Sequence, residues 1–259
     1  MPHAATGTLR MDATDHGALG TYREWAPPAA LASVVACAWE VQAGAPGGSV
    51  PPDNCADVLV HLAPDRSVLA VRAVGVMTQP ITVPATDVRV VGVRFRPGWW
   101  RATLGMPARM LRDDARPLAD VHRRVARALS GGVPHAMTPT QWMLDALARA
   151  VTDAPPAAVR TALAAIARTG GRATVPQLAR EAGVSRQHLG RLFDEWVGVG
   201  PKFASRVARV EHAFDARAST PGGGWSQIAA ACGFADQAHL IREARALRGA
   251  TPGEWVMHD

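Results

Sequence analysis

The chain has 259 residues, which is enough for one or two domains with a hydrophobic core. Hydrophobic residues make up 48% of it and charged residues 19%, the composition of an ordinary soluble globular protein, and the net charge is +6. Three widely spaced cysteines argue against a disulfide framework or a zinc site, and no apolar run suits a signal peptide or approaches the ~20 residues that cross a bilayer, so we expect a cytoplasmic protein without a membrane partner.

The first part of the chain predicts a β-rich domain. Short apolar or alternating runs, separated by Gly and Pro, are typical of strands, and they recur at 34–42, 56–63, 67–76, 81–83 and 88–95. Residues 42–53 are rich in Gly and Pro and predict a loop. From Pro97 the apolar spacing becomes helical, and further helices are expected around 118–151, one of them at 139–151. Residues 153–156 then look like a linker.

Two clusters in this part are candidates for an effector pocket. The first is an Asp-Asn-Cys sequence before a strand, for which the alternative is a turn stabilised by side chains beside a small buried cysteine. The second is an Arg-Phe-Arg sequence followed by tryptophans, which suits an acidic effector; the alternative is a strand edge beside a core tryptophan pair. In both clusters the alternative is the commoner explanation. The candidate pocket residues are Asp53, Asn54, Arg94, Arg96 and Trp99, with Cys55 as a candidate sensor thiol.

The last two fifths of the chain contain one motif twice. Residues 177–189 and 227–240 share Gln, Ala, Gly, Gln and a His-Leu pair at matched positions, with one inserted residue in the second copy. Each copy predicts a helix, a tight turn at Gly183 or Gly233, and a second helix, which is how a helix-turn-helix presents side chains to the major groove. Ser185 and Asp236 are the expected N-caps of the second helices, at 186–196 and 237–248.

The repetition of the motif favours DNA binding. A single copy is as often plain helical packing as it is a DNA-binding unit, but here the motif occurs twice and both second helices carry arginines. Residues 160–259 hold 13 Lys and Arg against 9 Asp and Glu. This excess suits a phosphate-binding surface, although taken alone it is more often a solvated face.

Further short motifs continue through this segment: Leu178-Ala179, Gly183-Val184-Ser185, His188-Leu189, Arg191-Leu192-Phe193, Gly200-Pro201, Ile228-Ala229, Cys232-Gly233-Phe234, Asp236, His239-Leu240, Arg242 and a closing Gly-x-Thr-Pro-x-x-Trp at 249–255. Together they resemble the AraC/XylS family of bacterial transcription regulators, over about residues 157–257. The resemblance implies a seven-helix domain in which a long helix, here about 201–218, joins two helix-turn-helix units.

The N-terminal half is also similar to part of this family. Trp39, residues 52–60 and residues 93–98 look similar to an uncharacterised N-terminal domain of some members. The implied fold class is α+β: a β-rich, barrel-like domain with helices, followed by an all-α DNA-binding domain. We divide the chain into a sensory or effector domain at 1–115, a helical connector at 116–153 that either forms a dimer seam or covers the sheet, and the double helix-turn-helix domain at 157–259.

The resemblance also implies which side chains face DNA. The candidates for base edges are Gln187, Arg191, Gln237, Ile241 and Arg242, and those for phosphates are Arg186, Ser226 and Arg245. The chain departs from the family in two places. Ala244 replaces an aromatic core anchor, for which Ile241 or Leu247 is the expected substitute, and Gly190 replaces a longer side chain, so the first helix should read fewer bases.

The sequence therefore predicts a regulator that binds promoter DNA with two recognition helices in adjacent major-groove segments. RNA polymerase, a small-molecule effector and a second copy of the chain are further partners that this function leaves open. No catalytic, cofactor or metal motif occurs, so we do not expect an enzyme. The alternatives are a DNA-tethered redox or repair enzyme that uses Cys55, and a non-specific architectural binder, which the Gln and Arg side chains of the recognition helices disfavour.

Overall fold

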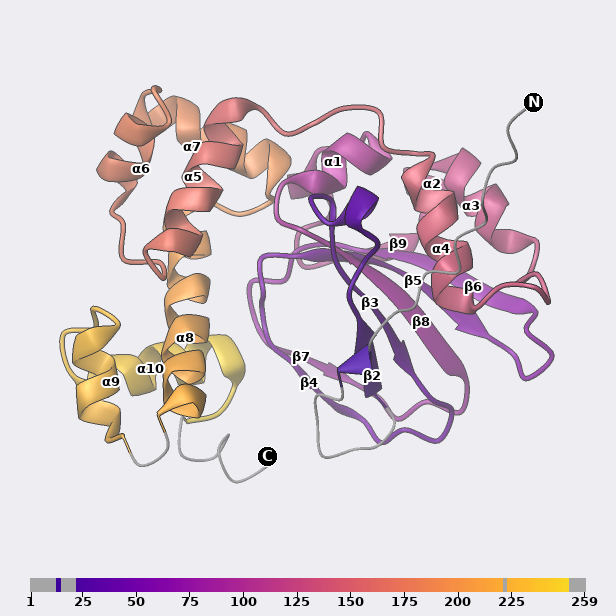
Figure 1. Cartoon of the computed structure of the whole chain (residues 1–259), viewed down its shortest axis with the longest axis horizontal. Helices are drawn as coiled ribbons and strands as arrows, with labels where there is room; N and C mark the ends of the chain where they lie inside the picture. The colour runs from indigo at the N-terminus through magenta and orange to yellow at the C-terminus, as the bar shows by residue number, and fades with distance from the viewer. Residues whose placement is uncertain (1–12, 15–21, 221–222, 252–259) are drawn as a thin grey trace.

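The computed structural model describes residues 13–14, 22–220 and 223–251 (Figure 1). The strands are β1 (Ala13–Thr14), β2 (Tyr22–Trp25), β3 (Val35–Val41), β4 (Gly48–Val50), β5 (Ala56–Leu62), β6 (Val68–Val74), β7 (Ile81–Val83), β8 (Arg89–Phe95) and β9 (Ala115–Pro117). The helices are α1 (Trp99–Leu104), α2 (Leu118–Val121), α3 (Arg123–Ser130), α4 (Pro139–Ala148), α5 (Ala157–Arg168), α6 (Val175–Glu181), α7 (Arg186–Trp196), α8 (Pro201–Ser219), α9 (Trp225–Ala231) and α10 (Gln237–Arg248), with short 3-10 turns η1 (Ala29–Leu31) and η2 (Ala108–Leu111).

Seven antiparallel strands form the main sheet, in the order β1-β2-β3-β8-β5-β6-β9. Residues 56–62 form strand β5 because their side chains are alternately buried and half-buried, as a strand with two different faces requires. At its neighbour β8, Gly92 lies under the ring of Trp39, and a Cβ at this position would come within 2.1 Å of that ring. The β-rich domain expected from the sequence is therefore confirmed.

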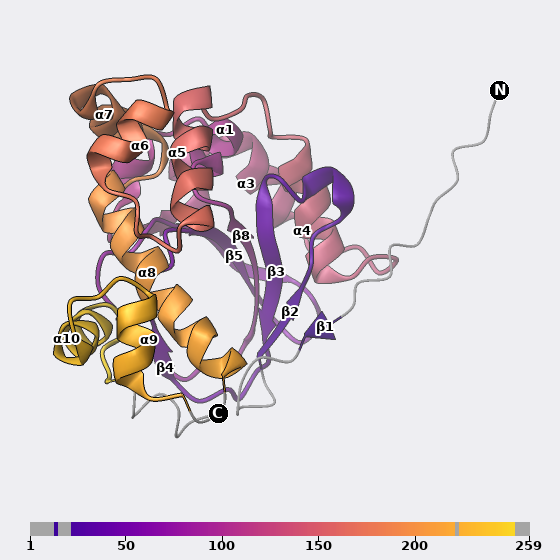
Figure 2. The ribbon, with the colours of Figure 1, turned by 60° about the vertical axis from the view of Figure 1, so that its left-hand side comes forward.

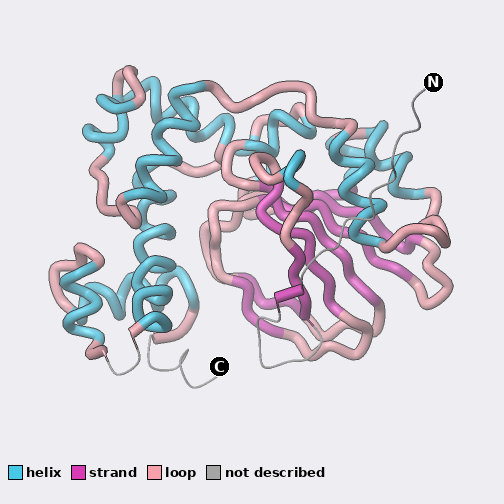
Figure 3. Tube along the Cα trace, in the orientation of Figure 1, coloured by secondary structure: helices cyan, strands magenta, loops and turns pink. Residues whose placement is uncertain are grey.

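A second, two-stranded sheet pairs β4 with β7 (Figure 3). The Gly and Pro content of residues 42–53 predicts only a loop, and this prediction is wrong for Gly48–Val50. Because β4 is three residues long, with two exposed residues, it has no apolar alternation of its own. It forms because β7 offers a partner more than thirty residues later in the chain.

Helices α2, α3 and α4 cover one face of the main sheet (Figures 1 and 3). They belong to segment 116–153, which the sequence analysis treated as a connector with two possible roles. Their apolar side chains share one hydrophobic cluster with the sheet, including Leu118, Val125, Leu129, Met143 and Leu147 from the helices and Val58, Val60 and Val93 from the strands. These helices therefore complete the core of the N-terminal domain.

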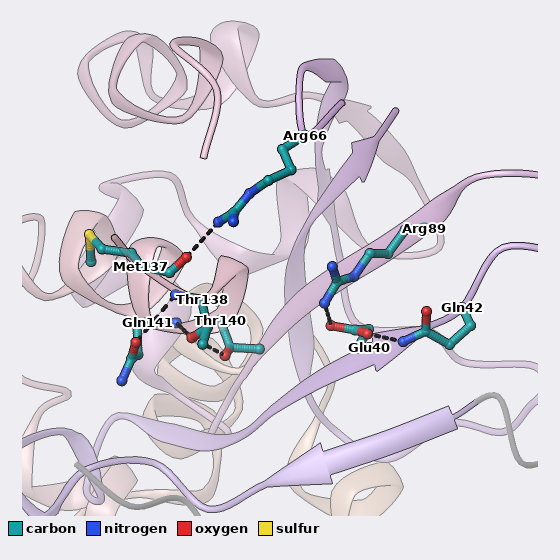
Figure 4. Close-up of polar contacts among 8 residues, drawn as sticks. All are labelled: Glu40, Gln42, Arg66, Arg89, Met137, Thr138, Thr140 and Gln141. Atoms are coloured by element: carbon teal, nitrogen blue, oxygen red, sulfur yellow. Dashed lines mark hydrogen bonds and ion pairs between the residues drawn. The ribbon is translucent and has the colours of Figure 1, made fainter. Parts of the chain in front are cut away.

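Polar contacts fix the start of α4 beside the sheet (Figure 4). Thr138 caps α4 in a reciprocal capping box with Gln141. Arg66, in the turn between β5 and β6, donates to the carbonyl of Met137 at 2.5 Å.

The buried Glu40 of β3 accepts hydrogen bonds from Arg89 at 2.5 Å and from Gln42 (Figure 4). The buried carboxylate is thus paired, as burial of a charge requires.

Six α-helices, α5 to α10, lie in the described part of the chain after residue 156. The long helix α8 links α5–α7 to α9–α10 (Figures 1 and 2). Two separate hydrophobic clusters run through these helices. The first continues from the sheet through α5, α6 and α7 to Ala204 on α8, and the second begins at Val207 and includes α9 and α10. None of the helices in the described residues has the length and apolar character of a membrane span.

Candidate nucleic-acid interface

The first helix-turn-helix unit consists of α6 and α7. Gly183 ends α6 with a φ of 68°, a left-handed conformation that a glycine adopts without strain. The hydroxyl of Ser185 accepts from the amide of His188 at 3.1 Å and caps α7. Leu178, Leu189 and Phe193 are buried where the helices cross. The predicted bounds of α7, its cap and its turn are all confirmed.

The outer face of α7 carries the side chains proposed for DNA. Arg186, Gln187 and Arg191 are exposed, and within residues 22–220 and 223–251 none of them makes a side-chain hydrogen bond or ion pair. Gln187 and Arg191 are four residues apart and therefore share one face of the helix. Beside them lies Gly190, around which the space for a side chain is empty. The helix thus presents unpaired donors and a bare backbone on one face.

The second unit consists of α9 and α10. Gly233 turns the chain with a φ of 77°, and a carboxylate oxygen of Asp236 accepts from the amide of His239 at 2.6 Å. Arg242 and Arg245 are exposed on α10, without a side-chain hydrogen bond or ion pair to the rest of the described chain, and Ile241 is half-buried. The capping and the bounds predicted for α10 are confirmed.

Ser226 and Gln237, which the sequence analysis assigned to different parts of the DNA, contact each other. The hydroxyl of Ser226 on α9 donates to the amide oxygen of Gln237 on α10 at 2.7 Å, and both side chains are exposed. This bond uses one of the two lone pairs of the Gln237 amide oxygen and leaves its NH₂ group free to donate.

The core of the second unit is closed without the aromatic residue that Ala244 replaces. Ala244 is fully buried, and Leu247 is only 3% exposed. Of the two substitutes expected from the sequence, Leu247 lies in the core, whereas Ile241 is half-buried. At the edge of this cluster, the ring of Phe214 packs against that of Trp225, with centroids 5.6 Å apart.

An arginine on α8 connects the two units. Arg209 donates from Nε and Nη2 to the carbonyl of Gly171, at 3.2 and 3.0 Å, and its guanidinium lies 5.7 Å from the ring centroid of Phe234. Gly171 lies between α5 and the first unit, and Phe234 follows the turn of the second. The backbone of Gly171 is packed so closely on α8 that a Cβ would lie 2.1 Å from the carbonyl oxygen of Ser205. The spacing of the two units is thus set by direct contacts as well as by α8.

The N-terminal domain holds the C-terminal end of α7. Arg112 donates to the carboxylate of Asp194 and to the carbonyl of Gly198. Arg101, on α1, forms an ion pair with Glu195 and stacks on Trp196 at 4.7 Å from its ring centroid. The first recognition helix is therefore anchored to the N-terminal domain.

A cavity of about 630 Å³ lies between the N-terminal domain and helices α5 and α8. Four of the five residues proposed for an effector pocket line it: Asp53, Asn54, Arg96 and Trp99. Asn54 is only 6% exposed, and its amide Nδ2 donates to the carbonyl of Ala204 on α8 at 3.1 Å. The pocket residues from two distant stretches of sequence are thus brought together.

The fifth residue, Arg94, is engaged by carboxylates and does not line the cavity. Its guanidinium lies 3.1 Å from Asp53, 3.4 Å from Asp57 and 3.7 Å from Glu24. Trp39 donates to the same oxygen of Asp57 at 2.7 Å. Burial nevertheless raises the pKa of Asp57 above its ordinary range, against the effect of Arg94. Arg94 acts here as the partner of Asp53 at the cavity wall.

Comparison with known proteins gives two matches to family models. Residues 178–257 match one described as a helix-turn-helix domain, and residues 23–117 match one described as a domain of unknown function. The first match covers the segment that carries the AraC/XylS motifs and the two helix pairs. The C-terminal part of the chain is a helix-turn-helix domain of the AraC type. No curated protein matches it in sequence.

Among solved structures, a probable AraC family transcriptional regulator from Rhodopseudomonas palustris is 26% identical, covering 39% of this regulator and 94% of that chain, with a TM-score of 0.35. ToxT from Vibrio cholerae is 9% identical, covering 92% and 98%, with a TM-score of 0.46. Wild-type ToxT with a bound unsaturated fatty acid is 11% identical, covering 87% and 94%, with a TM-score of 0.43. Since these TM-scores lie below 0.5, the assignment rests on the family model and the helix pairs.

In this AraC-type regulator Cys55 does not have the setting of a reactive thiol. It lines the cavity, but burial and the charge of Asp53 raise the pKa of its thiol well above the ordinary value. A nucleophilic or redox-active cysteine needs a lowered pKa. The geometry thus favours a neutral thiol in the wall.

The α8 side of the cavity was not predicted from the sequence. Glu211, His212 and Asp215 line it from α8, and Arg160 from α5. Burial and the nearby charge of Asp53 raise the pKa of Glu211 to about 8. The helical period of α8 groups these residues on one face, but the sequence does not say what that face meets. Of the closing motif at 249–255, residues 252–255 lie outside the described residues.

Proposed function

We propose that the regulator reads promoter DNA with α7 and α10 in successive major-groove segments on one face of the duplex. The observation that carries this proposal is the set of exposed, unpaired side chains on both helices, among them Gln187, Arg191 and Arg242. Arginine suits guanine through two parallel hydrogen bonds, and glutamine suits adenine. The half-buried Ile241 is available to contact a thymine methyl group.

The contact of Ser226 with Gln237 refines this assignment. With its oxygen held by Ser226 at 2.7 Å, the Gln237 amide has its NH₂ group free to donate to a base acceptor in the groove. We propose Arg186 and Arg245 as phosphate contacts. Ser226, expected from the sequence at a phosphate, donates its one hydroxyl proton to Gln237, so we propose that it orients Gln237 instead. Phosphate contacts position the protein on the duplex, and the base contacts specify the sequence.

The bridge between the units supports simultaneous reading of both grooves. Helix α8 and the contacts of Arg209 with Gly171 and Phe234 hold the two units at one spacing. Successive major-groove segments on one face are about 34 Å apart. A spacing that differs from this value would require the DNA to bend, at a cost that depends on its sequence.

We further propose that the N-terminal domain senses a small molecule in the cavity. The support is the clustering of Asp53, Asn54, Arg96 and Trp99 in the wall that faces α8. Since α8 also carries the second unit, an occupant of this cavity contacts the element that sets the geometry of both recognition helices.

Fluorescence anisotropy tests the DNA-binding proposal. A duplex from the region upstream of the regulator's own gene is compared with a scrambled duplex over a series of salt concentrations. We expect a preference of about 10³-fold or more for the cognate duplex at physiological salt. Equal binding to both, with a steep dependence on salt, would leave only a non-specific interaction with phosphates for that duplex.

Two arginine variants separate base contacts from phosphate contacts. Arg242→Ala should cost about 1–3 kcal/mol on the cognate duplex and relax specificity at one base pair. Arg186→Ala should weaken binding to every duplex alike and reduce the salt dependence. Arg127→Ala, an exposed arginine on α3 of the N-terminal domain, is the matched control and should bind as the wild type does. Equal losses on all duplexes for Arg242→Ala would reassign it to a phosphate.

A further inference from the structure

The polar groups that line the cavity differ in exposure. The buried or half-buried ones are hydrogen-bond acceptors or acids: Asp53, Asn54 and Glu211. The exposed ones are the basic Arg96, Arg160 and His212 and the acidic Asp215. Because water screens exposed charges, the groups with the stronger influence on an occupant are the acidic ones.

Asn54 provides an acceptor that the protein itself does not use. Its backbone is held in a left-handed conformation with a φ of 62°, and its Nδ2 is occupied by the carbonyl of Ala204. Its Oδ1 is buried and has no hydrogen-bond partner in the described part of the chain. An orphaned acceptor of this kind destabilises a folded protein, and a donor brought by a ligand would satisfy it.

Glu211 lacks a positive partner within 4 Å among the described residues, although it is half-buried. The charged groups that act on it are the acids Asp53 and Asp215 and, with opposite effect, Arg248 and Arg94. The net effect, dominated by burial, favours the neutral carboxyl group, as its pKa of about 8 indicates. A cation placed beside this group would reverse that preference.

The remaining wall is apolar. It includes Trp99 from the N-terminal domain, Leu163 and Ile166 of α5, and small alanines on α5 and α8. On α8 the lining residues are Ala204, Ala208, Glu211, His212 and Asp215. Ala204, Ala208, Glu211 and Asp215 follow at intervals of four, three and four residues, which places them on one face of the helix. This face spans the point where the first hydrophobic cluster ends and the second begins.

We propose that this cavity binds a small organic cation with an apolar body, such as a protonated amine, with its charge against Glu211 and a donor toward Oδ1 of Asn54. The proposal rests on the sensing function proposed above and gives it a ligand class. Since the bound cation contacts α8, its binding couples to the geometry of the recognition helices.

Calorimetry on the full chain tests the ligand class with three probes of one shape. They are 2-phenylethylammonium, the neutral 2-phenylethanol and the anionic 3-phenylpropanoate. We expect the cation to bind at least about tenfold more tightly than the other two. The reason is that only the cation forms a charge pair with Glu211, and this site is partly buried. At about pH 7 its heat of binding should vary with the ionisation enthalpy of the buffer, because Glu211 releases a proton when the cation binds.

Two variants and one control locate the site. Glu211→Gln removes the charge with little change in shape and should weaken binding of the cation by about tenfold or more. Ala164→Trp fills the cavity from an exposed position on α5 and should abolish binding. Asp87→Asn, an exposed acid between β7 and β8, should bind the cation as the wild type does. Circular dichroism melting confirms that each variant is folded before it is titrated.

Three results would overturn the proposal. They are tighter binding of the anion, no binding of any of the three probes, and unchanged binding of the cation to Glu211→Gln or Ala164→Trp. The coupling through α8 is tested by anisotropy with the cognate duplex, where saturating cation should change the affinity by about threefold or more. An unchanged affinity would refute that coupling. Failure of DNA recognition itself would appear without ligand, as equal affinity for cognate and scrambled duplexes, and would leave the calorimetric result intact.

Discussion

Replacement of Gly190 by alanine should stabilise the regulator. Gly190 lies in the middle of α7, between four helical residues before it and six after it, and its φ is not in the left-handed region. No heavy atom lies within 4 Å of the position that a Cβ would take. The substitution therefore removes the conformational entropy cost of a helical glycine and introduces no steric conflict.

The expected gain follows from helix propensity alone. Alanine is favoured over glycine in a helix interior by about 0.8–1.0 kcal/mol, and no buried contact is lost that would reduce this difference. For a chain of this size, 1 kcal/mol corresponds to a rise in the melting temperature of about 2–4 °C. Urea unfolding followed by circular dichroism measures the free energy, and thermal melting gives an independent value. A loss of stability would show that the helix around Gly190 needs a bare backbone for internal packing, contrary to the geometry above.

The same substitution at Gly171 should have the opposite sign. Gly171 has a φ of 72°, which costs a residue with a side chain about 1–2 kcal/mol. Its Cβ would also lie 2.1 Å from the carbonyl oxygen of Ser205 and 2.7 Å from the amide nitrogen of Arg209, and both atoms belong to the backbone of α8. We therefore expect Gly171→Ala to destabilise by more than about 2 kcal/mol. Equal effects at the two glycines would refute the reasoning for both.

Two further predictions concern the second unit and the cavity. Leu240→Ala, at a fully buried position of the second cluster, should cost about 2–5 kcal/mol and should raise amide hydrogen exchange in α9 and α10 while that in α6 stays unchanged; uniform acceleration would mean that the two clusters unfold together. Glu211→Gln should change the pH dependence of stability, because the folded wild type holds its proton up to a pKa of about 8 and the unfolded chain only to about 4.5. Stability of the wild type relative to the variant should therefore fall as the pH rises through this window, and a constant difference between about pH 5 and about pH 8 in urea unfolding would contradict the assigned pKa.

The recognition helices were predictable because their signals are local. Each recognition helix begins after a serine or aspartate that precedes a run of apolar residues at helical spacing, and a glycine stands two or three residues before that cap. These signals define the start of α7 and α10 without knowledge of the rest of the fold. The structure confirms Ser185 and Asp236 as caps through hydrogen bonds to residues three positions later. The exposure of Gln187 and Arg191 follows from the same period.

What the sequence could not supply depends on contacts between distant segments. Asn54 donates to a carbonyl 150 positions away, and no pattern near either residue predicts that pairing. Glu211 and Asp215 look like ordinary solvated residues of a long helix until the N-terminal domain is placed opposite them. Strand β2 was missed because its four residues, one of them exposed and three half-buried, show no alternation.

The continuous core described above limits which parts of such regulators are exchangeable. A cut at residues 153–156, where composition suggests a linker, would divide the first hydrophobic cluster and separate Arg112 from Asp194. A sensor domain transplanted at that point would meet a foreign α7 without its matching surface. A cut inside α8, between Ala204 and Val207, would leave both hydrophobic clusters whole. It would instead part Arg209 from Gly171 and divide the α8 wall of the cavity, so each cut removes a different kind of contact.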